Sequence, residues 1–388
     1  MFSNRFNWEL SPNALSLILQ NQKSKGETIF DLTQSNPTQA GFDYDAADIL
    51  AALAQAEAMT YEPEPRGLLK ARRAIAQYYL DRGVPIESDA VFLTAGTSEA
   101  YSSIFKLLGN PGDEILIPRP GYPLISYLAR FENLQPFSYP LRYDDEQGWS
   151  IDLEVLQALI TPKCRAIVVI NPNNPTGNYL KPHELAALDR ICRRSGLALI
   201  VDEVFSDYFR AGRPPEVPTV VNRTRALTFV LNGFSKMLGL PQVKLGWVVI
   251  GGEPGLAGEA QARLELLLDF YLSVATAAQH AAAMLLGHRQ EIQRQILARL
   301  ADNEGFLIDR ISRSANCRSL AREGGWYAVI EIIDAMSDDD RIRRLLERAH
   351  TLVHPGYFYE FDKEGMVVVS LLTPVETFRA GIERLIAT

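Results

Sequence analysis

A succession of short, fully apolar runs between residues 67 and 250 is the feature that most limits what this chain can fold into. Runs that are apolar on successive residues suit strands buried on both faces, and the stretches between them have helical periodicity. We therefore predict an α/β fold in which helices cover both faces of a mainly parallel sheet. The predicted strands are AVFLTA (90–95), EILIPR (114–119), RAIVVI (165–170), LALIVDE (197–203), ALTFVL (226–231) and KLGWVVI (244–250).

The character of the sequence changes after residue 286. Charged amphipathic stretches alternate there with the strand-like WYAVIEII (326–333) and MVVVSLL (366–372), which is an α+β composition. A chain of 388 residues is also long enough for two packing units. We expect a large domain of residues 46–285 and a small domain made of 1–45 and 286–388.

Charge and hydropathy exclude two classes of partner. The chain has 39 Lys and Arg against 47 Asp and Glu, a net charge of −8, so we expect no basic face for nucleic acid. The longest apolar stretch, 264–287, is interrupted by Glu265, Asp269, Gln279 and His280. This pattern predicts a pair of buried helices and no membrane segment.

The cysteines and the beginning of the chain indicate a location. Cys164, Cys192 and Cys317 are an odd number, are widely spaced and have no histidine at metal-ligand spacing, so we expect a reducing, cytoplasmic setting and no metal site. The beginning of the chain carries Asn7 and Glu9 before a short apolar run and has no small-residue cleavage pattern. We therefore expect no signal peptide.

Polar side chains follow three of the predicted strands. NPNNPTG (171–177) comes directly after one strand, at the place where open α/β sheets bind ligands, although an ordinary turn would look similar. Asp202 ends the next strand, where a single acid is often a helix N-cap. Lys236 follows the strand after that, and a single lysine is usually a solvated surface group. None of the three is decisive alone.

Taken together, these motifs resemble those of a known enzyme family. NPNNPTG, then DE with an aromatic residue three positions after the acid, then SKMLGLPQVKLG are similar in order and spacing to the fold-type I, class I/II aminotransferases, the family of aspartate aminotransferase. These enzymes use pyridoxal 5′-phosphate. The resemblance covers nearly the whole chain, and it implies a large domain with a mainly parallel seven-stranded sheet plus a smaller α+β domain.

The resemblance assigns roles around the cofactor ring. Lys236 would form the Schiff base with the cofactor and then move the substrate proton as general acid and base. Asp202 would keep the pyridine nitrogen protonated. Asn174 would donate to the 3-oxygen of the ring, and Tyr122, in RPGYP, would stack on its face.

The resemblance also assigns the phosphate site. Gly96, Thr97 and Ser98 open a helix after a strand and would form the phosphate loop, although TSE is also an ordinary capping pattern. Ser235 would add a hydroxyl. Tyr61, in YEPEPRG, would reach the phosphate in the neighbouring subunit, so the resemblance implies a homodimer with shared active sites.

Four positions depart from the family pattern. Lys244 stands where an arginine usually clamps the phosphate, so a point charge replaces a bidentate fork. Gly233 stands where a phosphate-binding serine is common. Phe205 replaces a tyrosine whose hydroxyl donates to the 3-oxygen. Val368 occupies the place of the arginine that binds the substrate α-carboxylate.

Substrate contacts are assigned to Asn174, to Asn36 in DLTQSNPT, and to Arg66 beside the Tyr61 motif. The resemblance implies a ping-pong aminotransferase that moves an amino group from an amino acid or related amine to a 2-oxo acid through Lys236. A lyase of the β-elimination or cyclisation type on the same fold is the alternative, which the missing clamps leave open. A transcription-regulator effector domain is not expected, because the short segment before Tyr61 leaves no room for a winged-helix module.

Overall fold

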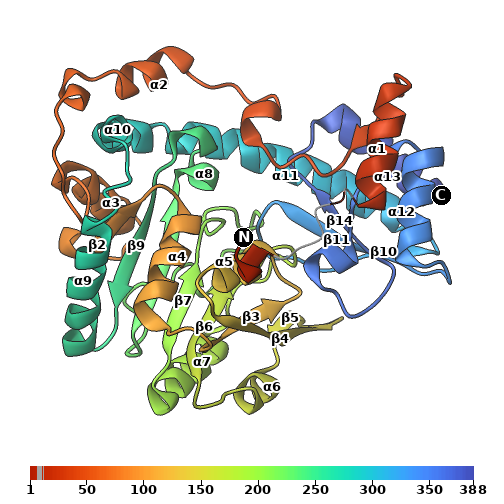
Figure 1. Cartoon of the computed structure of the whole chain (residues 1–388). Coiled ribbons are helices and arrows are strands. Elements are labelled where there is room, and N and C mark those ends of the chain that lie inside the picture. The colour runs from red at the N-terminus through yellow and green to blue at the C-terminus, as the bar shows by residue number, and fades with distance from the viewer. Residues whose placement is uncertain (7–10, 12) are drawn as a thin grey trace.

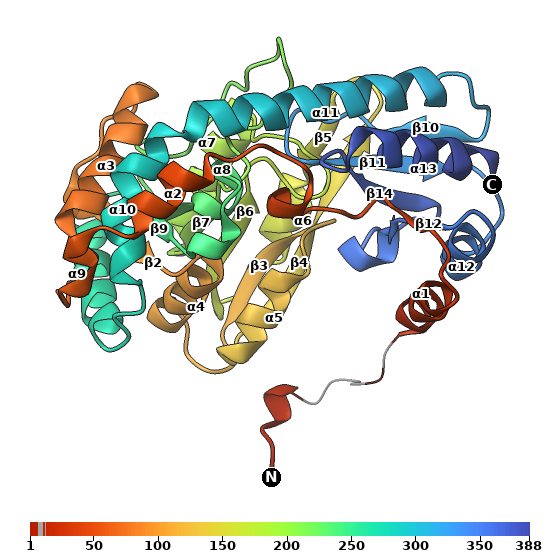
Figure 2. The same ribbon diagram turned by 90° about the horizontal axis from the view of Figure 1, so that it is seen from above.

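Two separate β-sheets, one beside the other, organise the computed structural model of the chain (Figures 1 and 2). The larger has eight strands in the order β2-β9-β8-β7-β6-β3-β4-β5, and the smaller has four in the order β10-β11-β14-β13. The structure describes residues 1–6, 11 and 13–388. Asn7 and Glu9, on which the expectation of no signal peptide partly rests, lie outside the described residues.

The larger sheet confirms the predicted α/β class. Its strands are β2 (Val91–Thr94), β3 (Glu114–Arg119), β4 (Gln135–Asp144), β5 (Gly148–Ile151), β6 (Cys164–Ile170), β7 (Ala198–Asp202), β8 (Thr228–Gly233) and β9 (Gly246–Gly251). The strands β8, β7, β6, β3 and β4 are parallel neighbours, and the β2–β9, β9–β8 and β4–β5 pairs are antiparallel.

The strand number differs from the seven that the resemblance implied. The eighth strand, β5, forms a hairpin with the end of β4, where Leu141 pairs with Ile151. The apolar runs of the sequence did not indicate β4, because it contains Pro136 and Pro140 and alternates partly exposed with buried residues. A strand near the edge of a sheet needs no continuous apolar run, since only part of it is covered.

Helices cover the larger sheet on both faces. On one face lie α4 (Thr97–Leu108), α5 (Leu124–Phe131) and α9 (Pro254–Asp269), and on the other lie α3 (Leu69–Asp81), α7 (Pro182–Ser195) and α10 (Thr276–Gly287). Successive residues of β6 alternate between the two cores: Val168 packs toward α4, α5 and α9, whereas Ile167 and Val169 pack toward the opposite layer. This double burial is the reason for the continuous apolar runs.

The smaller sheet lies at the far end of a long helix. That helix, α11 (Arg289–Ile311), runs from the larger sheet to the smaller one (Figure 2). The remaining elements of this part are α1 (Ala14–Ser24), β1 (Phe30–Asp31), β10 (Cys317–Ser319), β11 (Tyr327–Ile332), α12 (Asp338–Arg348), β12 (Thr351–Leu352), β13 (His354–Pro355), β14 (Met366–Ser370) and α13 (Val375–Ala387).

The N-terminal segment joins the smaller part, because β1 pairs in parallel with β12. Further along, α2 (Ala46–Leu53) packs against α10 of the larger part. The predicted boundaries at residues 45 and 285 stay a prediction, since the sheets alone do not locate them.

The apolar stretch 264–287 falls in α9 and α10, which agrees with the predicted helix pair. In the part of the chain that the structure describes, no helix is both long enough and apolar enough to cross a membrane. The same described residues contain no cluster of three or more histidine, cysteine or acidic side chains placed to hold a metal ion.

The loop after β6 connects the two parts through glycine backbone. The Gly177 carbonyl accepts hydrogen bonds from the N–H groups of Glu323 (3.1 Å) and Gly324 (2.8 Å), directly before β11. Gly177 has φ of +74°, and a Cβ placed on it would lie 2.4 Å from the Gly324 oxygen. Only glycine fits here, since both the left-handed backbone and the close approach exclude a side chain.

We expect Gly177→Ala to lower the free energy of unfolding by about 2 kcal/mol or more, because backbone strain of order 1 kcal/mol adds to a displaced carbonyl. Urea denaturation followed by circular dichroism measures it. Gly196→Ala is the matched control: Gly196 has φ of +67° but open space around its Cβ position. Equal losses in the two variants would contradict the contact with Gly324.

Candidate active site

One pocket collects the ends of three neighbouring strands. Asn174 follows β6, Asp202 ends β7, and Lys236 lies on the short helix α8 (Phe234–Met237) directly after β8. Ten of the residues singled out from the sequence line this pocket: Gly96, Thr97, Ser98, Tyr122, Asn174, Asp202, Phe205, Gly233, Ser235 and Lys236. The carboxyl ends of parallel strands meet at one edge of a sheet, which is why residues far apart in the sequence gather here.

Lys236 lies among aromatic rings. Its Nζ is 5.2 Å from the centre of the Trp326 ring and 5.6 Å from that of Phe205. The hydroxyl of Tyr208 donates to the Lys236 backbone oxygen (2.6 Å) and fixes the start of the side chain. Burial lowers the pKa of the Lys236 amine, and the negative charge of Asp202 opposes this shift more weakly. A lysine with a lowered pKa is suited to nucleophilic attack and to proton transfer.

Asp202 is a buried carboxylate with two donors. Its Oδ1 accepts from the Val204 N–H and its Oδ2 accepts from the Tyr101 hydroxyl, both at 3.1 Å. Burial raises its pKa to about 6, against the effect of the two donors and of Lys236. The group is therefore mostly ionised at neutral pH. It fits the partner that a protonated ring nitrogen requires.

The start of α4 has the features of an anion site. Gly96 precedes this 12-residue helix with φ of 142°, and a Cβ added to it would lie 3.7 Å from the Lys244 Nζ. Lys244 itself takes a left-handed backbone, with φ of 56°. Backbone N–H groups at a helix start, the hydroxyls of Thr97 and Ser98, and one cation are the donor set that phosphate takes.

Close packing of the strands β8 and β9 explains why position 233 is a glycine. A Cβ on Gly233 would lie 3.0 Å from both the Gly246 Cα and the Leu245 oxygen, so a side chain here would require a small shift of the β9 backbone. Ser235 remains as the hydroxyl of that turn in the pocket.

The loop after β6 leaves two buried amide oxygens without a partner among the described residues, Oδ1 of Asn173 and Oδ1 of Asn174. Asn173 ties the loop down, since its Nδ2 donates to the Pro120 oxygen (3.1 Å) and to Thr176 Oγ1 (2.7 Å). Asn174 is 7% exposed, and no described residue bonds its Oδ1. A buried amide without a protein partner at a pocket wall fits a ligand that supplies the bond. The donor set as a whole fits pyridoxal phosphate.

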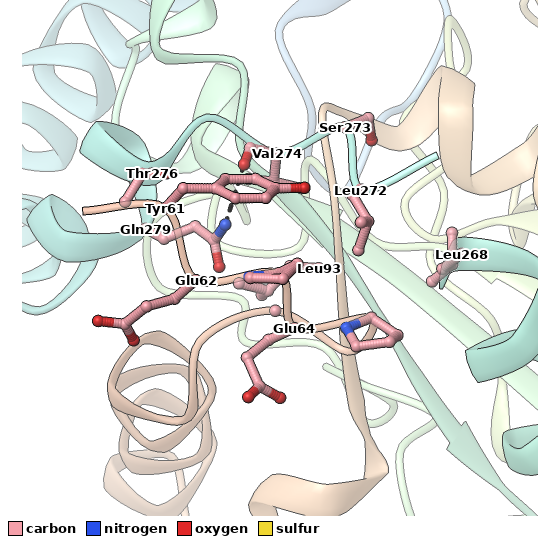
Figure 3. Close-up of a pocket in the computed structure, with 13 residues that line it drawn as sticks. Tyr61, Glu62, Glu64, Leu93, Leu268, Leu272, Ser273, Val274, Thr276 and Gln279 are labelled. Carbon is pink, nitrogen blue, oxygen red and sulfur yellow. Dashed lines mark hydrogen bonds between the residues drawn. The ribbon is translucent and has the colours of Figure 1, made fainter. Parts of the chain in front are cut away.

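Besides Lys244, whose amine lies beside Gly96 but which is not among the residues that line the pocket, three predicted residues do not line it. The side chain of Tyr61 is 71% exposed and borders a separate hollow with Thr276 and Gln279 (Figure 3). Arg66 is paired with Glu265 (2.7 Å) and also donates to the Asp89 oxygen. Their assigned roles stay predictions.

Asn36 is the third predicted residue that does not line the pocket. Its side chain caps a short turn and accepts a hydrogen bond from the Thr38 N–H (3.1 Å). Its neighbour Ser35 reaches the pocket instead. The departure at Val368 is visible in the fold: this residue is fully buried in β14, opposite Val329 and His354, and does not line the pocket.

Sequence reasoning missed Tyr101, Tyr327 and Ser35, which also line the pocket. Tyr101 falls four residues after Thr97, and this helical spacing places both side chains on one face. Tyr327 lies in the predicted strand 326–333, and Ser35 directly precedes Asn36 in DLTQSNPT, but the sequence assigned no role to either residue. Only the docking of the smaller sheet brings these two residues to Lys236.

Comparison with known proteins gives matches over most of the chain. An alanine aminotransferase of Mycobacterium tuberculosis is 29% identical over 375 residues, which are 94% of this chain and 86% of that protein. Nicotianamine aminotransferase 1 of Oryza sativa subsp. japonica is 34% identical, over 88% of this chain and 70% of that protein.

A solved structure agrees with the fold. The alanine aminotransferase from Pyrococcus furiosus superposes with a TM-score of 0.89 and 25% identity, covering 99% of this chain and 98% of that one. Residues 27–385 match the family described as aminotransferase class I and II, whose members use pyridoxal phosphate. The chain belongs to this aminotransferase family, and it is a pyridoxal-phosphate-dependent transferase.

Proposed function

We propose that the Lys236 pocket moves an amino group from an amino acid or a related amine to a 2-oxo acid, in two half-reactions at one site. The observation that carries this proposal is that one pocket holds an amine with a lowered pKa, a buried carboxylate and an anion site together. We assign Gly96, Thr97, Ser98, Ser235 and Lys244 to the cofactor phosphate. Asp202, Asn174, Tyr122 and Phe205 are assigned to its ring.

Each of the pocket residues has a separate role in the transfer of the amino group. When bound, the cofactor supplies a carbonyl that exchanges between amines and a ring that accepts electrons. Lys236 holds the cofactor and then, as a free amine, moves the proton at the substrate Cα. The ionised Asp202 would accept a hydrogen bond from the ring nitrogen and so keep the proton on that nitrogen. The aromatic side chains around Lys236 keep water from this amine. Nothing in the described part of the chain favours the lyase alternative.

We expect Lys236→Ala to lower turnover by at least about 100-fold, because both attachment and proton transfer are lost. The loss is measured as the absorbance change of the cofactor on mixing with an amino donor in a single turnover. Lys106→Ala is the control, since Lys106 pairs with Glu132 on the surface of α4 and should leave the rate unchanged. Wild-type turnover in Lys236→Ala would refute the assignment.

The substrate end of the pocket contains no facing cation from this chain other than Lys236, among the residues that the structure describes. Val368 is buried and does not line the pocket, whereas Ser35, Tyr122 and Tyr327 line it and carry hydroxyls that are not assigned to the phosphate or to Asp202. We propose that these neutral donors receive the group that the family holds with arginine. Amines without an α-carboxylate are therefore a second class of donor.

Alanine and isopropylamine form a matched pair of amino donors, because isopropylamine has a methyl group where alanine has its α-carboxylate. We expect the single-turnover rates at low donor concentration to differ by about 150-fold, since two hydrogen bonds from hydroxyls to a charged carboxylate contribute roughly 1.5 kcal/mol each. The measurement is the same absorbance change. A preference for alanine above about 1000-fold would show that a cation, such as an arginine of a second subunit, holds the carboxylate.

A homodimer with shared sites is our proposal for the assembly. Tyr61 lies outside the Lys236 pocket of its own chain, so it can act only on another copy. Four apolar side chains within two positions of the lining residues Tyr61, Leu268 and Leu272 are more than half exposed: Met59, Leu266, Phe270 and Tyr271. Exposed apolar side chains of this kind favour a protein interface there. The free cysteines support a reducing, cytoplasmic setting, which we also propose.

We expect Tyr61→Phe to raise the dissociation constant of pyridoxal phosphate about tenfold, because one hydrogen bond to a charged group is lost. Equilibrium titration of the apoenzyme measures it. Tyr357→Phe removes an exposed hydroxyl elsewhere and should have no effect. A monomer by light scattering, or an unchanged constant in Tyr61→Phe, would contradict the shared site.

A further inference from the structure

Asp202 has a buried partner on another element. The Tyr101 hydroxyl, from α4, donates to Asp202 Oδ2 at 3.1 Å, while Val204 N–H donates to Oδ1 at the same distance. Tyr101 is 2% exposed and Asp202 is 8% exposed, yet both line the Lys236 pocket. The carboxylate is therefore held by one donor on each oxygen and still faces the pocket. Each oxygen keeps a lone pair for a further donor.

The position of Tyr101 on helix α4 explains why its hydroxyl lies beside Asp202. Tyr101 follows Thr97 by four residues and precedes Phe105 by four, so the three side chains share one face of the helix. The rings of Tyr101 and Phe105 are 5.7 Å apart, which fixes the direction of the phenol. The first turn of α4 thus serves the anion site, and the next turn serves Asp202.

Some features around Asp202 favour its ionised form, and others oppose it. Lys236, from α8, favours the ionised carboxylate, and burial opposes it. The neighbouring carboxyl of Glu203 accepts from Val220 N–H and has its own pKa raised to about 7 by burial. Burial and the adjacent Asp202 raise the pKa of Tyr101 well above its ordinary value, so the phenol stays a neutral donor. It is a hydrogen-bond donor throughout the neutral pH range.

We propose that Tyr101 is a positioning residue that keeps the Asp202 carboxylate ionised for the ring nitrogen of the bound cofactor. A donor to a carboxylate stabilises its charged form, so the proton shared with the ring stays on nitrogen. Loss of the phenol moves this proton toward the carboxylate oxygen, and the ring then accepts electrons less well. The inference rests on the proposed function.

The test uses Tyr101→Phe in the holoenzyme loaded with pyridoxal phosphate that carries ¹⁵N in its ring. The ¹⁵N chemical shift reports directly whether the ring nitrogen holds the proton. We expect the signal to move toward the unprotonated value, with the proton-sharing equilibrium changed about tenfold or more. The turnover number should fall with little change in the donor concentration at half-saturation.

Tyr139→Phe is the matched control. Tyr139 is also fully buried, and its hydroxyl donates to the Val168 oxygen at 2.7 Å without contact to Asp202. Its loss should lower stability without moving the ¹⁵N signal. A fluorinated tyrosine introduced at position 101 keeps the fold and the hydroxyl but is a stronger donor. It should move the signal in the direction opposite to Tyr101→Phe.

An unchanged ¹⁵N signal in Tyr101→Phe would overturn the proposal even if activity fell, because the role of Tyr101 would then be packing alone. A shift of equal size in Tyr139→Phe would overturn it as well. Failure of the proposed function would look different, since the wild-type protein would then bind no pyridoxal phosphate or show no half-reaction with any donor.

Discussion

Two opposite charges buried at the ends of neighbouring strands, Lys236 and Asp202, are the constraint on which the site depends. Neither is stable in an apolar interior by itself, because desolvation penalises both charged forms. Burial lowers the pKa of the amine and raises that of the carboxyl, while their mutual attraction limits both shifts. The same burial that makes the pair costly gives each group its chemistry.

The surrounding structure satisfies this pair without exposing it to water. Tyr101 and Val204 donate to the carboxylate, and Tyr208 fixes the backbone of the lysine. Rings of Phe205 and Trp326 face the amine. The site is thus supported from both sheets, since Trp326 directly precedes β11 of the smaller one. The hydrogen bonds between Gly177 and the segment before β11 hold these parts together.

Each of the four departures from the family pattern has a different physical explanation. At Gly233 the strands β8 and β9 approach so closely that a side chain would require the neighbouring backbone to shift. Lys244 keeps a cation beside the phosphate loop, although without the fork geometry of arginine. Phe205 packs edge-on against Trp326, so its ring has a packing role that needs no hydroxyl. Val368 belongs to the core of the smaller sheet and not to the pocket.

The sequence by itself determined the α/β class and the positions of Asn174, Asp202 and Lys236, because doubly buried strands leave continuous apolar runs and end at the same edge of the sheet. It did not indicate β4, whose prolines and exposed residues break that pattern, or β5, a four-residue strand in which buried and half-buried residues alternate. Tyr101 and Tyr327 entered the site only in the folded chain. Their contacts depend on how α4 and the smaller sheet pack against the strand ends, and such long-range docking leaves no local pattern in the sequence.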